Sequence, residues 1–224
     1  METNRRDFIK TFSAMAAAGM FSSRMPWLGE LHAQDSTDPV TLGIIGVGSR
    51  GSLLLTYLLE IPGVEISCFC DDYEPHFDRA QQMIGKRARG YRDYRRMLEQ
   101  EELDGVVIAT PLDRHAWMTV DALDAGLHVF CEKAMAKTYE DCDRMVRAQQ
   151  RNNKILYIGH QRLFSTLTLA GIRKIEEGAL GDITQIRAHW HRNNDWRRPV
   201  PSPELERKIN WRLYHEYSCG LMTE

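Results

Sequence analysis

The chain has 224 residues and a mass of 25.9 kDa, which suffices for one full domain and the beginning of another. Its 29 lysines and arginines against 31 aspartates and glutamates leave no basic surplus, so a nucleic-acid partner is disfavoured and a small molecule is favoured. The five cysteines include no CxxC spacing, which predicts neither a zinc site nor a disulfide framework.

The first 33 residues have the layout of an export signal. The pair Arg5-Arg6 opens "RRDFIK", a twin-arginine pattern, and a short run rich in alanine, serine and glycine follows. That run is too short for a membrane span and Arg24 interrupts it, which disfavours a stable membrane anchor. We expect a signal peptide over 1–33, cleavage after Ala33, and export to the periplasm by the twin-arginine machinery.

Segments of strand and helix type alternate along the next 120 or so residues. Short apolar, often β-branched runs predict strands at 40–46, 64–72, 104–110, 127–131 and 154–160. Longer runs that close at glycine, proline or asparagine predict helices at 52–60, 75–85, 113–126 and 138–153. This alternation implies right-handed crossovers, so we predict an α/β domain with a doubly wound parallel sheet over 34–160.

The pattern changes after residue 160. A helix that ends in glycine is predicted over 165–181, and the alternation of apolar and polar residues predicts a strand with one wet face over 182–194. A proline-rich stretch follows. We interpret 161–224 as the beginning of a second, sheet-containing domain.

The junction between the first predicted strand and helix reads G-x-G-x-x-G, with Gly46, Gly48 and Gly51 as its glycines. The first glycine allows a tight turn, the second lets a pyrophosphate approach the backbone, and the third lets helix and strand pack closely. Ser49 and Arg50 lie between the second and third glycines, and the N-terminus of the helix that follows offers free amides and a positive dipole end. The pattern therefore predicts a dinucleotide site.

An acidic residue, Asp71, ends the second predicted strand, with Asp72 beside it. A carboxylate at this place accepts hydrogen bonds from both hydroxyls of an adenosine ribose and repels a 2′-phosphate, so NAD is favoured over NADP. The opposing interpretation uses Arg50 as a clamp for a 2′-phosphate, in company with the two aspartates.

Polar residues come after three successive predicted strands. Thr110 follows one strand, Glu132 and Lys133 follow the next, and Gln161 and Arg162 follow the third. Ligands of doubly wound sheets bind outside the carboxyl ends of the strands. Contact with solvent alone does not require polar residues after three successive strands. We therefore predict a ligand-binding site at the carboxyl ends of these strands.

The motifs G-x-G-x-x-G, "ATPLDRH", "CEKAMAK" and "GHQRLF", in this order, resemble those of the glucose–fructose oxidoreductase, inositol dehydrogenase and rhizopine-catabolism (Gfo/Idh/MocA) family. The resemblance runs from Val40 to the end of the chain. It implies a Rossmann domain that binds NAD(P), followed by an α+β substrate domain with an open, mainly antiparallel sheet over 161–224. Members mostly oxidise or reduce sugar and cyclitol hydroxyls, and they often pair through the open sheet.

The family's Glu-Lys-Pro motif places its lysine against the nicotinamide region and the substrate hydroxyl, and Lys133 falls on that position. Such a lysine can polarise the hydroxyl or relay its proton during hydride transfer. Ala134 replaces the proline, which removes a fixed φ and leaves the turn freer. The resemblance also implies His115 at the diphosphate side or at the helix start, and Gln161 near the nicotinamide ribose.

Substrate residues are expected in the second domain. Arg162 lies at its start, and Trp190, Trp196 and Trp211 are interleaved with polar residues such as His191. Flat apolar faces beside hydrogen-bond donors suit a sugar ring, although packing in a core accounts for any single tryptophan equally well.

Three functional interpretations stay open. The first is an NAD-dependent oxidoreductase acting on a sugar, glycoside or cyclitol hydroxyl. The second is a glycosidase that uses NAD as a transient oxidant, because "GVGSRG" resembles the NAD-dependent α-N-acetylgalactosaminidases. The third is a non-catalytic nucleotide-binding remnant. The chain ends at "EYSCGLMTE", before the family segment that carries a substrate histidine, so we expect NAD binding without appreciable turnover by this chain.

Overall fold

The computed structural model describes residues 38–189, 191, 193 and 196–220. The predicted signal over 1–33 and the predicted substrate residue Trp190 lie outside these described residues. One compact unit ends at Gly159 and another begins at His160. Within the described ranges, no helix has both the length and the apolar character that a membrane span needs.

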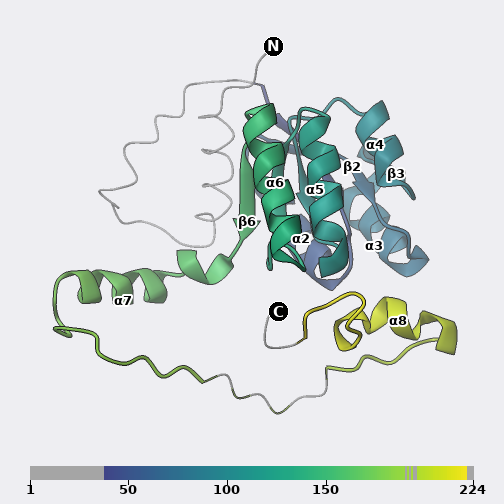
Figure 1. The fold of residues 1–224 in the computed structure, drawn as a ribbon. Coiled ribbons are helices and arrows are strands. Elements are labelled where there is room, and N and C mark those ends of the chain that lie inside the picture. The colour runs from purple at the N-terminus through teal and green to yellow at the C-terminus, as the bar shows by residue number, and fades with distance from the viewer. Residues whose placement is uncertain (1–37, 190, 192, 194–195, 221–224) are drawn as a thin grey trace. The chain divides into compact units, whose positions relative to one another are not determined.

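The first unit is built on six parallel strands in the order β3-β2-β1-β4-β5-β6 (Figure 1). The strands are β1 (Val40–Ile45), β2 (Val64–Cys70), β3 (Arg89–Tyr91), β4 (Gly105–Ile108), β5 (His128–Glu132) and β6 (Leu156–Gly159). Because β1 pairs with β2 on one side and β4 on the other, the winding reverses between β1 and β4. The predicted doubly wound parallel sheet is confirmed.

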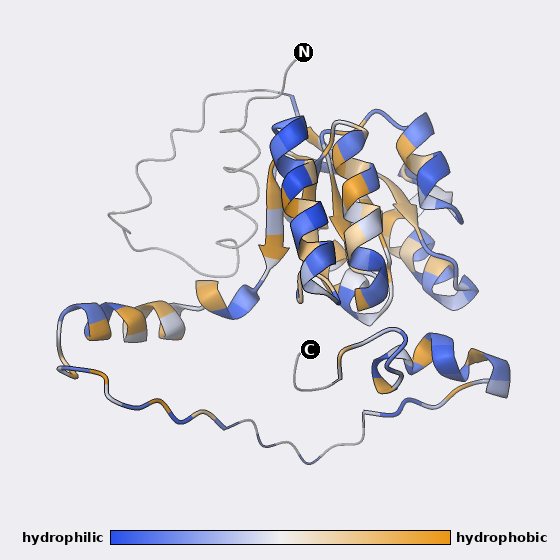
Figure 2. Cartoon of the chain, viewed as in Figure 1, coloured by the Kyte–Doolittle hydropathy of each residue, from blue (hydrophilic) through white to orange (hydrophobic). Residues whose placement is uncertain are grey.

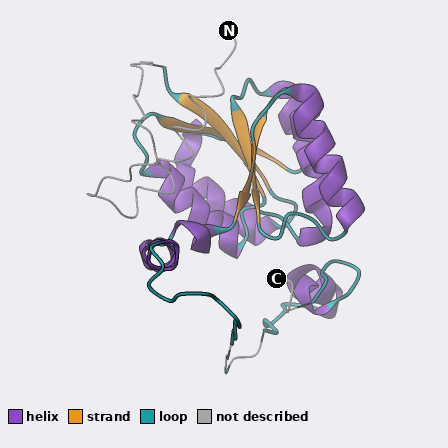
Figure 3. Cartoon of the chain, turned by 60° about the vertical axis from the view of Figure 1, so that its left-hand side comes forward, coloured by secondary structure: helices purple, strands orange, loops and turns teal. Residues whose placement is uncertain are grey.

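Helices cover both faces of this sheet (Figure 3). They are α2 (Ser49–Leu59), α3 (Glu74–Ile84), α4 (Tyr94–Gln100), α5 (His115–Asp124) and α6 (Tyr139–Asn152). Four of the five were predicted, with ends that differ by a few residues. The prediction missed α4 and the strand β3 that precedes it.

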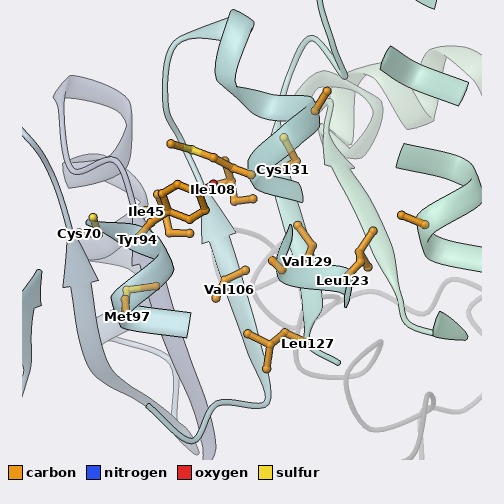
Figure 4. Close-up of a cluster of buried hydrophobic side chains, with 14 of the residues drawn as sticks. Ile45, Cys70, Tyr94, Met97, Val106, Ile108, Leu123, Leu127, Val129 and Cys131 are labelled. Carbon is orange, nitrogen blue, oxygen red and sulfur yellow. The ribbon is translucent and has the colours of Figure 1, made fainter. Parts of the chain in front are cut away.

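Successive residues of the strands point to opposite faces and build two cores. Ile44 and Val107 pack with side chains of α2 and α3, whereas Ile45, Val106 and Ile108 pack with side chains of α4, α5 and α6 (Figure 4). The strands are therefore apolar on both faces, while the outer helix α6 is largely hydrophilic (Figure 2). Burial on both faces is what a parallel sheet requires, and it holds the strand ends in fixed positions.

The second unit contains α7 (Thr166–Glu176), α8 (Glu206–Ile209) and short 3-10 turns. The helix predicted over 165–181 is found as α7, where the Ser165 hydroxyl accepts a hydrogen bond from the Thr168 amide. The strand predicted over 182–194 is wrong for the described part of that stretch, which contains no strand. A strand needs a neighbour to pair its backbone groups, and no antiparallel sheet is present among the described residues of this unit.

Candidate nucleotide-binding site

The glycine-rich loop joins β1 to α2 with very little space around it. Gly46 has φ +86°, and a Cβ atom there would lie 2.8 Å from the Ala109 carbonyl oxygen. A Cβ atom on Gly51 would lie 1.9 Å from the Gly46 carbonyl oxygen. Both positions therefore exclude any larger residue unless the backbone moves, as the predicted tight turn and close helix packing require.

The start of α2 leaves its first amides available to a ligand. Gly48 is the N-cap residue, and because glycine has no side chain, the N-cap position provides no side-chain acceptor for the first turn. The loop is held from other directions, because Ser52 Oγ and Arg79 Nη2 donate to the Val47 carbonyl oxygen at 2.7 and 3.3 Å. Uncapped amides together with the helix dipole suit a phosphate group.

Asp71 directly follows β2 and is 9% exposed. Its Oδ2 atom accepts a hydrogen bond from the Val47 amide at 2.8 Å, and its Oδ1 atom accepts one from the Tyr73 amide at 2.9 Å. The His76 ring lies beside it, with Nδ1 3.5 Å from Oδ2. The carboxylate thus ties the turn after β2 to the glycine-rich loop, where the sequence predicted ribose recognition.

Two residues of α3, His76 and Arg79, contact the glycine-rich loop. They were not predicted. A Cβ atom on Gly48 would lie 3.2 Å from His76 Cε1, so the imidazole packs directly over the second glycine. The two residues are three positions apart and therefore share one helix face. This spacing, in the helix that follows the acidic residue, is the signal that could have identified them.

Glu132 is the last residue of β5, whereas the prediction placed it after the strand. It is 5% exposed, its Oε1 atom accepts a hydrogen bond from Arg50 Nε at 2.7 Å, and the Lys133 amide donates to its Oε2 atom at 3.3 Å. Arg50 therefore reaches toward β5, and Asp71 lies at the end of β2 on the other side of β1. This direction disfavours the interpretation of Arg50 as a 2′-phosphate clamp.

His115 is the first residue of α5 and is only 2% exposed. Its ring spans two carbonyl oxygens, with Nε2 3.0 Å from the Thr110 oxygen and Nδ1 2.9 Å from the Ala134 oxygen. No side chain caps the start of α5 in the described chain. The imidazole thus lies between the carbonyl groups of Thr110 and Ala134, which follow β4 and β5, and a neutral ring donates a hydrogen bond to one of them. The Lys133–Ala134 peptide bond is cis.

Two polar atoms near the end of β4 are buried without a hydrogen-bond partner among the described residues, namely Thr110 Oγ1 and Asp113 Oδ1. Burial also raises the pKa of the Asp113 carboxyl above its ordinary value. Buried polar groups normally have partners, so a buried hydroxyl at a strand end beside the glycine-rich loop is suited to a bound ligand.

The first unit brings together most of the predicted site residues, namely Gly46, Gly48, Ser49, Arg50, Gly51, Asp71, Thr110, His115, Glu132 and Lys133. The remaining ones belong to the second unit. Gln161 and Arg162 are exposed residues of the 3-10 turn Gln161–Phe164. His191 is exposed with its ring stacked on His189 at 5.4 Å, and Trp196 is 38% exposed.

The geometry of the first unit fits a dinucleotide. The N-cap residue of α2 provides no side-chain hydrogen bond, the glycines permit close approach, and the Asp71 carboxylate follows the neighbouring strand β2. Residues 40–160, more than half of the chain, match the family model described as "Oxidoreductase family, NAD-binding Rossmann fold", Gfo/Idh/MocA. The chain belongs to this family of NAD-binding Rossmann oxidoreductases.

Relatives of known sequence carry glycosidase names. A glycosyl hydrolase family 109 protein of Shewanella pealeana is 26% identical, over 96% of this chain and 51% of its own length. A glycosyl hydrolase family 109 protein 1 of Shewanella sp. strain ANA-3 is 28% identical, over 78% of this chain and 39% of its own length. The chain thus spans about half the length, or less, of the curated relatives it matches.

Similar solved structures carry dehydrogenase names. The myo-inositol 2-dehydrogenase of Lactobacillus plantarum is 28% identical with a TM-score of 0.62, over 65% of this chain and 43% of that one. The WlbA dehydrogenase of Bordetella pertussis, solved with NADH and UDP-GlcNAcA, is 28% identical with a TM-score of 0.61, over 64% of this chain and 43% of that one.

Proposed function

We propose that the first unit binds NAD in preference to NADP and that the whole protein transfers hydride to or from a hydroxyl of a sugar, glycoside or cyclitol. The observation that carries this proposal is the Asp71 carboxylate, hydrogen-bonded to the Val47 amide at 2.8 Å beside the uncapped start of α2. A carboxylate there accepts from ribose hydroxyls and repels a 2′-phosphate. The NADH in the related WlbA structure supports the same choice.

Lys133 is the proposed catalytic residue. A bound nicotinamide supplies the hydride chemistry, and the protein supplies binding, orientation and control of the hydroxyl proton. The backbone of Lys133 is held on one side by its hydrogen bond to Glu132 and on the other by the contact between His115 and the Ala134 oxygen. Its side chain, placed from this turn, polarises the substrate hydroxyl or relays its proton.

A glycosidase that uses NAD as a transient oxidant is the second candidate. The names of the Shewanella relatives favour it, together with the loop sequence "GVGSRG". The two candidates differ in net redox change. A dehydrogenase accumulates NADH from free NAD and a sugar, whereas the glycosidase releases the aglycone of an aryl glycoside with no net NADH.

Export by the twin-arginine route is part of the proposal and rests on "NRRDFIK". Replacing the Arg5-Arg6 pair with two lysines is expected to trap the protein in the cytoplasm, as cell fractionation would reveal. Unchanged export of the variant would rule this route out.

Cofactor titration tests the binding proposal. Fluorescence titration of the chain is expected to give an NADH affinity at least about tenfold higher than the NADPH affinity, a difference of about 1.4 kcal/mol. Asp71→Asn, with folding checked by circular dichroism, is expected to remove that preference because the charge that repels the 2′-phosphate is lost. Equal or tighter binding of NADPH by the unmodified chain would overturn the proposal.

A further inference from the structure

The ion pair between Arg50 and Glu132 joins two parts of the site that are 82 residues apart in sequence. Arg50 is in the first turn of α2, between the second and third glycines of the motif, and Glu132 ends β5 next to Lys133. In the sheet, β4 lies between β1 and β5. The pair therefore crosses the carboxyl end of β4, on the side of the site away from Asp71.

The Glu132 carboxylate depends on this pair. Its side chain is 7% exposed and the Arg50 side chain 31% exposed, so the carboxylate is the more buried partner. The neighbouring strand leaves little room around it, since a Cβ atom on Gly159 would lie 3.2 Å from Oε1. A buried carboxylate that loses its cation is strongly disfavoured, and its surroundings move to hydrate it or find another donor.

Movement of Glu132 would be transmitted to the lysine turn. The Lys133 amide donates to Oε2 of this same carboxylate, and the Ala134 oxygen on the far side of the turn is 2.9 Å from His115 Nδ1. The turn thus has one contact at the Lys133 amide and one at the Ala134 oxygen. Arg50 pairs with the carboxylate that makes the first of these contacts. The backbone of Arg50 belongs to the first turn of α2, whose amides suit a phosphate group.

We propose that Arg50 is a positioning residue, which holds Lys133 through Glu132 and makes the placement of the lysine depend on the loaded glycine-rich loop. This inference rests on the proposed function, in which NAD occupies that loop. It assigns Arg50 to the lysine side of the site and gives it no part in selecting between NAD and NADP.

The experiment measures how fast an amine-acylating reagent modifies Lys133, quantified by peptide mass spectrometry with and without saturating NADH. The exposed Lys86, in the 3-10 turn Gly85–Arg87 that follows α3, serves as internal reference. In the unmodified chain NADH is expected to slow modification of Lys133 relative to the reference. In Arg50→Gln, NADH is expected still to bind and still to discriminate against NADPH, but the protection of Lys133 is expected to fall about tenfold.

Further variants separate positioning from general stability. Glu132→Ala removes the acceptor of both the Arg50 and the Lys133 hydrogen bonds and is expected to lose protection as Arg50→Gln does, so it keeps the test available if Arg50→Gln fails to fold. The double variant is expected to lose no more than either single one, because the two residues act as a unit. The control is Arg151→Gln, which breaks another ion pair of the first unit, with Arg151 Nε 2.9 Å from Asp124 Oδ1, and leaves protection unchanged.

Full protection of Lys133 in Arg50→Gln would overturn the inference about Arg50 but not the proposed NAD binding. The same holds if NADH binds the unmodified chain and leaves Lys133 unprotected. Loss of all NADH binding in Arg50→Gln would assign the residue to the cofactor itself and would equally overturn it. Failure of the unmodified chain to bind NADH would overturn the proposed function, and the inference with it.

Discussion

Two helices of equal length show how the two units differ. α2 in the first unit and α7 in the second both have 11 residues and both mix apolar with polar side chains. Leu55 of α2 is completely buried, whereas Leu167 of α7 is 85% exposed and no residue of α7 is buried within the described chain. An amphipathic pattern is enough to predict a helix, but packing of its apolar face supplies most of the stability.

The largest expected effect comes from making the same substitution in both helices. Leu55→Ala is expected to lower the free energy of unfolding by about 4 kcal/mol, because it leaves a cavity in a close-packed core. Leu167→Ala is expected to change it by less than about 0.5 kcal/mol. Urea denaturation followed by circular dichroism measures both. Similar losses from the two variants would show that α7 is packed as tightly as α2.

The buried core of the first unit is also expected to set a pH dependence. His128 begins β5 and is 2% exposed, and its Nδ1 atom accepts a hydrogen bond from the Ile155 amide at 3.0 Å. Burial lowers the pKa of His128 from 6.5 to about 4. Because the folded pKa lies below the unfolded one, this stabilisation is complete above pH 6.5 and is lost as the pH falls toward 4, by about 3 kcal/mol in total.

The matched variant is His128→Asn, whose side-chain oxygen can still accept from the Ile155 amide. The difference in unfolding free energy between the unmodified chain and this variant is expected to shrink steadily from pH 6.5 to pH 4. A difference that stays constant over this range would show that His128 titrates normally in the folded chain.

A smaller effect is expected at two helix ends. Asn153 closes α6 with φ +49°, and Gly178 follows the end of α7 with φ +78°. An alanine in this left-handed region costs about 1 kcal/mol. Asn153→Ala is expected to lower the free energy of unfolding of the first unit by that amount, and Asn153→Gly is expected to have little effect. Gly178→Ala should leave the main urea transition unchanged, and a shift as large as that of Asn153→Ala would show that α7 unfolds together with the first unit.

The two units also differ in how far sequence patterns predict them. Five strands of the first unit were predicted because burial on both faces makes them continuous apolar runs. β3 has only three residues, Arg89–Tyr91, at the edge of the sheet, so it has no such run, and the seven-residue α4 beside it is too short for a clear period. In the second unit alternation alone predicted a strand over 182–194, where the described residues have no pairing partner.

The geometry around the candidate site was predictable where one local motif determines it. The spacing of Gly46, Gly48 and Gly51 predicts the loop, and the acidic residue at the end of the next strand predicts Asp71. The pairing of Arg50 with Glu132 and the bridge from His115 to the Ala134 oxygen were not predictable. These contacts join the ends of different strands, so they depend on strand order and side-chain direction rather than on spacing.

Hydrogen exchange with and without cofactor tests the central claim most directly, namely that the first unit binds NAD at the carboxyl ends of its strands. The account predicts that NADH slows exchange of the amides in the glycine-rich loop and in the turn after Asp71, with α7 as internal reference, and that NADPH at the same concentration protects them much less. Absence of protection by NADH at this loop, or equal protection by NADPH, would contradict the account.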